Sequence, residues 1–307
     1  MKFIDMFAGI GGFRSGLEKA GHECVGYIEW DKYARKSYQA IYDTEGEFTA
    51  NDIREVKGIE LPDVDLWTFG SPCQDISIAG KQKGLVKGGR SSMFFEVIRL
   101  LKERIGGEKK VPAYLIMENV KALLSSNCGR DFARVLIEMD QVGYDAEWSV
   151  LNSSDVVPQN RERLYIIGHL RGTSTRQVFP IQRKSKILPS TETTYKRSYK
   201  VGIRQVGNIV KQKGFSNPQR GRIYSANGLS PTLNTAQGGG LEPKVLLDNT
   251  ESLAIRKLTP KECWRLQGFS DKQFDKAKQG GISNSQLYKQ AGNAVTVNVI
   301  EEIGKRL

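Results

Sequence analysis

The sequence predicts an α/β fold in which helices cover both faces of a mostly parallel sheet, together with a second, smaller and basic domain. Three observations support this prediction. The chain opens with a strand, a glycine turn and a helix; further apolar strand candidates alternate with helical segments; and the excess positive charge lies in one stretch. At about 150 residues per domain, a chain of 307 residues is long enough for two domains.

The N-terminal strand candidate, Lys2–Phe7, is followed by a glycine-rich turn over Ala8–Gly12 and a helical segment, Phe13–Ala20. Glycines allow the backbone to approach a ligand, and the amides at a helix N-terminus supply hydrogen-bond donors. The dinucleotide fingerprint needs a third glycine where Arg14 stands. The pattern therefore favours a nucleoside ligand that lacks a pyrophosphate.

The next segments offer polar partners for such a ligand. A second strand candidate, Cys24–Ile28, ends in Glu29, and an acid at this place can accept hydrogen bonds from ribose hydroxyls. Trp30 could pack on an adenine ring. Asp52, after a helix over Tyr33–Ile41, could accept from the adenine amino group. The alternative is an ordinary turn or cap, because Asp and Asn are common at such positions.

A single thiol follows the strand candidate Asp65–Phe69. Pro72 ends the strand, so Cys73 comes just past its carboxyl end, where open α/β sheets place active sites. A nucleophilic role requires a pKa below the usual value of ~8.5, and the alternative is a small buried hydrophobe, which this short stretch alone favours. The glycine- and lysine-rich loop 76–90 is typical of a lid that closes on a phosphate backbone, or of an ordinary exposed loop.

A carboxylate is expected in the same layer as Cys73. The strand candidate Pro112–Met117 ends in Glu118, which would raise the pKa of a neighbouring thiol and is better placed as an acid that hydrogen-bonds a substrate. Arg161 and Arg163 are two residues apart, so on an extended chain they share a face. They could stabilise an anionic substrate or Glu118.

Other elements follow from periodicity and capping signals. Thr259 opens a capping box, and Gly268 is expected to end the helix that it begins. The last apolar run, Val295–Ile303, is compatible with a helix or a strand. The remaining candidates are helices over Ser92–Arg104 and Asp131–Gln141, and strands over Trp148–Asn152 and Leu164–Leu170.

Charge is concentrated in one segment. The chain has 46 Lys and Arg and 34 Asp and Glu, a net charge of +12, and residues 171–250 carry 14 basic and three acidic residues, or +11. Clustered cations with interspersed aromatic and amide side chains favour a polyanion partner over a merely solvated basic surface.

Several classes of site are not expected. The four cysteines are widely spaced and only two histidines are present, so neither a metal site nor a disulfide framework is predicted. The sequence has no apolar run of ~18 residues and no signal peptide pattern, so we expect a cytoplasmic protein without a membrane span.

Six ordered blocks give the chain a specific resemblance over essentially its full length. The blocks are Phe7–Gly12, Ser71–Gln74, Met117–Val120, Gln159–Arg163, Lys257–Cys263 and Gln290–Val295. With these blocks in this order, the chain resembles the compact bacterial and phage cytosine-C5 DNA methyltransferases, which share the S-adenosylmethionine-dependent, Rossmann-like fold.

The resemblance implies a reaction and reverses the preference for an inert Cys73. Cys73 matches the nucleophile that adds to cytosine C6, so that C5 can take a methyl group from S-adenosylmethionine. Glu118 matches the acid that contacts N3 and the exocyclic amine, and Arg163, with Arg161 less closely, matches the arginine supporting the base pocket. The target base must be flipped out of double-stranded DNA.

The resemblance also implies binding residues and domains. The implied S-adenosylmethionine site comprises Phe7, Gly9, Gly11, Glu29, Trp30, Asp52, Ile53, Pro72 and Asn293. The implied DNA contacts are Gln74, Ser77, Lys81, Gln219, Arg222 and Thr232. We expect a catalytic domain over residues 1–170 completed by 286–307, a small, irregular, β-rich target-recognition domain over 171–257, and a connecting segment over 258–285. We expect the protein to be a monomer. A cognate restriction endonuclease that acts separately is a possible further partner. The enzyme is expected to be associated with the bacterial nucleoid when it acts.

Other functions remain as alternatives. A tRNA cytosine-5 methyltransferase of the same fold would carry a Cys-Phe-Thr signature, which none of the four cysteines provides. RNA enzymes that use two cysteines would need a cysteine near Glu118, and the sequence has none there, so this class is disfavoured. A catalytically silent DNA-binding relative is disfavoured because Cys73, Glu118 and Arg163 are all present, and an NAD-dependent oxidoreductase because the third glycine is missing.

Overall fold

The computed structural model describes residues 1–70, 93–181, 202–210, 217–236, 240–249 and 252–307. The chain divides into two compact units. The first comprises Met1–Leu151, Glu162–Ile181 and Val299–Leu307, and the second comprises Asn152–Arg161 and Gln182–Asn298. This division differs from the predicted boundaries, because residues 152–161 and 286–298 group with the second unit. The functional division into catalytic and target-recognition domains stays a prediction.

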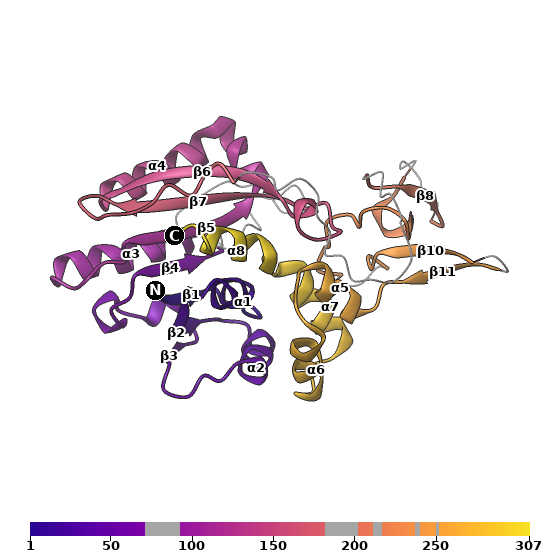
Figure 1. The fold of residues 1–307 in the computed structure, drawn as a ribbon, viewed down its shortest axis with the longest axis horizontal. Helices are drawn as coiled ribbons and strands as arrows, with labels where there is room; N and C mark the ends of the chain where they lie inside the picture. The colour runs from indigo at the N-terminus through magenta and orange to yellow at the C-terminus, as the bar shows by residue number, and fades with distance from the viewer. Residues whose placement is uncertain (71–92, 182–201, 211–216, 237–239, 250–251) are drawn as a thin grey trace. The chain divides into compact units, whose positions relative to one another are not determined.

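The first unit is built on a seven-stranded sheet with the order β3-β2-β1-β4-β5-β7-β6 (Figure 1). The run from β3 to β5 is parallel, whereas β7 is antiparallel to β5. The strands are β1 (Lys2–Met6), β2 (Glu23–Ile28), β3 (Phe48–Ala50), β4 (Leu66–Phe69), β5 (Tyr114–Val120), β6 (Tyr144–Asn152) and β7 (Glu162–Leu170).

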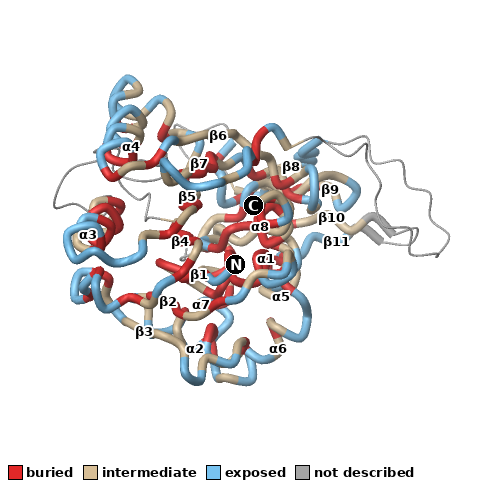
Figure 2. Tube along the Cα trace, turned by 60° about the vertical axis from the view of Figure 1, so that its left-hand side comes forward, coloured by how far each residue is buried: buried red, intermediate tan, exposed pale blue. Residues whose placement is uncertain are grey.

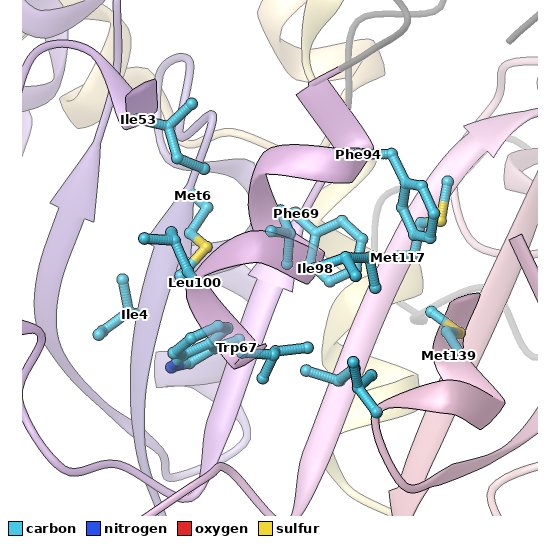
Figure 3. Packing of buried hydrophobic residues seen from close by; sticks show 14 of the residues in the cluster. Ile4, Met6, Ile53, Trp67, Phe69, Phe94, Ile98, Leu100, Met117 and Met139 are labelled. Atoms are coloured by element: carbon cyan, nitrogen blue, oxygen red, sulfur yellow. The ribbon is translucent and has the colours of Figure 1, made fainter. Parts of the chain in front are cut away.

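Helices cover both faces of this sheet because successive strand residues point to opposite sides. Ile4 and Met6 of β1 lie in one apolar cluster with side chains of α3, and the same cluster extends to Met139 of α4 (Figure 3). On the opposite face, Tyr27 of β2 stacks on Tyr38 of α2, with ring centroids 4.2 Å apart. The helices of this unit are α1 (Gly12–Lys19), α2 (Lys32–Ile41), α3 (Met93–Gly106) and α4 (Arg130–Gln141).

These findings confirm the predicted fold class. The buried residues follow β1, β4 and β5, and the outer sides of α3 and α4 are exposed (Figure 2). One detail differs from the prediction, and another decides between two alternatives that the sequence left open. Glu118 lies inside β5 and not beyond its end, and the C-terminal apolar run forms a helix, α8 (Val297–Gly304).

The second unit contains a four-stranded sheet with the order β11-β10-β9-β8. Its helix α5 begins with the predicted capping box, in which the Thr259 side chain and Glu262 each accept from the other's backbone amide, and Gly268 has a positive φ of 85° just after the helix. Trp264 is fully buried, and its Nε1 donates to the Leu287 carbonyl at 3.0 Å. The elements are β8 (Gln205–Asn208), β9 (Arg222–Ser225), β10 (Lys244–Asn249), β11 (Ser252–Lys257), α5 (Pro260–Leu266), α6 (Asp271–Gln279) and α7 (Asn284–Asn293).

Over the described ranges, no helix combines the length and apolarity that a membrane crossing requires. The same residues contain no group of three or more His, Cys, Asp or Glu side chains arranged to hold a metal ion.

Candidate active site

The glycine turn after β1 adopts left-handed backbone conformations that its sequence permits. Phe7, Gly9 and Gly11 have φ values of 56°, 57° and 81°. A Cβ atom on Gly9 would meet no atom of the described residues within 4 Å, so this part of the backbone is not covered by them. A Cβ on Gly11 would lie 2.4 Å from the Tyr42 ring, so only glycine fits there.

Arg14, at the position of the missing third glycine, supports this turn from behind. Its guanidinium is buried, donates to both oxygens of Glu47 at 2.9 and 2.8 Å, and lies 4.5 Å from the centroid of the Tyr42 ring. The Tyr42 hydroxyl in turn donates to the Gly11 carbonyl at 2.8 Å. The sequence showed that Arg14 departs from the dinucleotide pattern, but its contacts with Tyr42 and Glu47 depend on the tertiary fold.

Glu29 lies directly after β2 and is held by backbone amides. Its carboxylate accepts from the Gly9 amide at 2.7 Å and from the Asp31 amide at 2.6 Å. Burial raises the pKa of Glu29, although these two amides act in the opposite direction. The structure therefore brings the predicted acid and the predicted glycine turn into direct contact.

Trp30 and Asp52 are joined through a residue that the sequence analysis did not single out. The Trp30 side chain is 63% exposed, and the Arg54 guanidinium lies 4.6 Å from its ring centroid. Arg54 also donates to both oxygens of Asp52, and this interaction lowers the pKa of Asp52. Ile53, between them, is buried in the core. In the sequence, only the position of Arg54 two residues after Asp52 could have indicated that it belongs to this site.

Glu118 and Arg163 form an ion pair across two neighbouring strands. The Arg163 Nε lies 3.0 Å from Glu118 Oε1, and the side chains are 15% and 12% exposed. In the antiparallel register, Arg163 is opposite Val120, which places it diagonally to Glu118 on the same face of the sheet. The proposed interaction between these two residues is therefore present.

The backbone after β4 reaches this pair. A Cβ atom on Gly70 would lie 3.5 Å from Glu118 Oε2, so the oxygen that does not face Arg163 Nε is directed toward the end of β4. Five of the predicted site residues come after β4 in the sequence and lie outside the described residues: Pro72, Cys73, Gln74, Ser77 and Lys81.

Arg161 has different partners from Arg163. Its side chain is buried in the second unit and donates to the carbonyls of Leu233, Gly292 and Ala294 at 3.4, 3.2 and 3.0 Å. The sequence suggested that both arginines could reach Glu118, and the ion pair in the structure belongs to Arg163. Arg161 holds three segments of the second unit together.

The other predicted contacts lie in the second unit. Asn293 is an exposed residue at the end of α7. Gln219 is exposed and begins a short 3₁₀ helix, η7 (Gln219–Gly221), and Arg222 follows it in β9. The Thr232 hydroxyl donates to the Asn160 carbonyl at 2.7 Å.

Comparisons with known proteins agree on one family. The C-5 cytosine-specific DNA methylase family matches residues 1–307. Type II methyltransferase M.HhaI of Haemophilus parahaemolyticus is 35% identical over 323 residues, which cover 99% of this chain and 93% of that protein. Orphan methyltransferase M.SPBetaI of Bacillus phage SPbeta is 30% identical over 436 residues, which cover 100% and 97%. The fold is similar to that of S. pombe Dnmt2 methyltransferase, with a TM-score of 0.70 at 17% identity over 98% of this chain and 96% of that one.

Proposed function

Because the chain belongs to the C-5 cytosine-specific DNA methylase family, we propose that it methylates cytosine at C5 within one short DNA sequence, with Cys73 as the nucleophile. The observation that carries this proposal is the Glu118–Arg163 ion pair beside the end of β4. An acid and a guanidinium in this arrangement suit a base whose ring becomes charged during the reaction.

The residues around the glycine turn fit S-adenosylmethionine. Gly9 is not covered by any described residue, Glu29 offers carboxylate lone pairs to hydroxyl donors, and Trp30 exposes an aromatic ring. Asp52 is kept ionised by Arg54 and can accept from an amino group. When bound, this cofactor supplies an electrophilic methyl group.

The protein side chains account for the remaining chemistry. The Cys73 sulfur adds to C6, which makes C5 nucleophilic enough to be methylated. The C5 proton then leaves, the bond between sulfur and C6 breaks, and the C5–C6 double bond and the thiolate are restored. Glu118 contacts N3 and the exocyclic amine of the base, while Arg163 fixes the orientation of Glu118 and offsets charge.

The experiment that tests this function is bisulfite sequencing of plasmid DNA from a methylation-free host that expresses the chain, with Cys73→Ala as the control. We expect conversion-resistant cytosines in one short sequence context, and none with the variant. Complete conversion in both samples, from soluble protein that binds S-adenosylhomocysteine, would contradict DNA methylation and favour an RNA substrate or a silent DNA-binding relative.

A further inference from the structure

A five-residue turn in the second unit has every one of its backbone carbonyls bound. In this turn, residues 217–221, hereafter the reading turn, the carbonyl of Asn217 accepts from Arg222 Nη2 at 3.1 Å, and the carbonyl of Pro218 accepts from Asn208 Nδ2 at 2.8 Å. The carbonyls of Gln219 and Gly221 accept from the backbone amides of Arg222 and Ile209. Lys244 binds the remaining carbonyl, that of Arg220, at 2.7 Å.

Lys244 is a basic residue of this segment whose charge is directed inward. It is 7% exposed, and its ammonium donates to three backbone carbonyls, those of Arg220, Gly240 and Glu242, at 2.7, 2.6 and 3.2 Å. A lysine ammonium has three donors, so these contacts use all of them. Burial lowers the pKa of Lys244, as expected for a cation that is removed from water.

The reading turn is also closed on its other side. A Cβ atom on Gly221 would lie 1.9 Å from Asn208 Oδ1 and 2.7 Å from the Val210 amide nitrogen. The backbone of the reading turn is therefore packed directly against the end of β8. Asn208 Nδ2 also donates to Asn217 Oδ1 at 2.7 Å. In contrast, the side chains of Gln219 and Arg220 are exposed. A fixed backbone therefore presents two side chains of the kinds that read base edges.

We propose that Lys244 is a positioning residue for DNA sequence recognition, which fixes the reading turn so that Gln219 and Arg220 meet the bases in one geometry. This inference rests on the proposed function, because it takes duplex DNA as the ligand. It assigns Lys244 no contact with a phosphate, since its three donors are bound within the protein. Among the described residues, Lys244 is thus a cation that shapes the reading surface and is not available to the DNA backbone.

The test uses a short duplex that carries the methylated sequence found by bisulfite sequencing, and duplexes with one base pair of that sequence changed. For Lys244→Met we expect the preference in kcat/KM for the cognate duplex to fall about tenfold or more, as when a base contact loses its geometry. The affinity for S-adenosylhomocysteine and the slope of log Kd for DNA against log salt should stay as in the wild type. Lys257→Met is the matched control, because Lys257 is more exposed and pairs with Glu242 in the same region.

Unchanged discrimination in Lys244→Met would overturn the proposal. A salt slope that falls by about one would also overturn it, because that is the signature of a phosphate contact. If Lys244→Met does not fold, Asn208→Ala removes another contact of the reading turn and should relax discrimination in the same way; retained discrimination in that variant would refute the proposal. A wild-type chain that methylates no DNA would refute the proposed function itself.

Discussion

Glu118, inside β5, and Glu29, directly after β2, are both acids of the first unit, yet their surroundings differ. Glu118 pairs with the guanidinium of Arg163, whereas Glu29 accepts from the backbone amides of Gly9 and Asp31. Hydrogen bonds from backbone amides fix the position of a carboxylate through dipoles, while a guanidinium adds a full positive charge beside it.

This difference suits two tasks. A cation beside Glu118 can offset charge that changes during a reaction, which is what a catalytic acid needs. Amides around Glu29 hold a static hydrogen-bonding site, which is what a cofactor pocket needs. On the proposed function, Glu118 acts on the reaction rate and Glu29 acts on cofactor affinity, and four measurements test this difference.

The largest effect is expected at Glu118. Glu118→Gln keeps the shape of the side chain but removes the acid, so kcat should fall by about 10²–10⁴-fold, the usual contribution of a positioned acid or base. The affinity for S-adenosylhomocysteine should not change. Glu162→Gln is the control, because Glu162 is an exposed neighbour on β7 that pairs with Lys121. A kcat of Glu118→Gln within threefold of the control would remove Glu118 from the chemistry.

A smaller effect of a different kind is expected at Glu29. Glu29→Gln places an amide group against the Gly9 and Asp31 donors and removes charged acceptors worth about 1.5–3 kcal/mol, so Kd for S-adenosylhomocysteine should rise about 10–100-fold. Calorimetry would measure the Kd, and kcat at saturating cofactor should stay near the wild-type value. Glu23→Gln, at the exposed start of β2, is the control. Loss of kcat with unchanged Kd would reverse the comparison.

The pH dependence of cofactor affinity follows from the same residue. Burial raises the pKa of Glu29, so its carboxylate becomes protonated at a higher pH than an ordinary glutamate would as the pH falls. Only the ionised form accepts from hydroxyl donors with both oxygens. Below the raised pKa, affinity for S-adenosylhomocysteine should therefore fall by up to about tenfold per pH unit. Equal pH profiles for wild type and Glu29→Gln would show that another group titrates.

The smallest effect is expected where a hydroxyl holds the glycine turn. Tyr42→Phe removes the donor to the Gly11 carbonyl, and a net loss of about 1 kcal/mol corresponds to about a fivefold weaker cofactor affinity. Tyr144→Phe is a matched control, because the buried Tyr144 hydroxyl donates to the Pro112 carbonyl in the same unit. Equal cofactor Kd values for the two variants would mean that Tyr42 contributes only to stability.

Local signals in the sequence predicted most of the elements. The strand, glycine turn and helix at the N-terminus, and the capping box at Thr259, depend on residues close together in the chain. The alternation of strands and helices also predicted the sheet. That β7 runs antiparallel to β5 could not be predicted, because a single strand carries the same apolar pattern in either direction.

The site was predicted where a side chain meets another side chain of opposite charge, as with Glu118 and Arg163. The contacts of Lys244 and Arg161 could not be predicted, because each side chain binds backbone carbonyls. Every residue has a backbone carbonyl, so the sequence does not indicate which of them will be bound. Arg14 was noticed only as a missing glycine. Its partner Glu47 lies 33 residues away, so no local pattern connects them.

The position of β7 in the chain has a consequence for the order of events during synthesis. The glycine turn, Glu29 and Asp52 are all made before residue 55, so these three parts of the first unit emerge from the ribosome early. Arg163 emerges 45 residues after Glu118, and the acid has no guanidinium beside it until β7 is in place. A growing chain therefore carries the glycine turn, Glu29 and Asp52 well before Glu118 has its guanidinium partner.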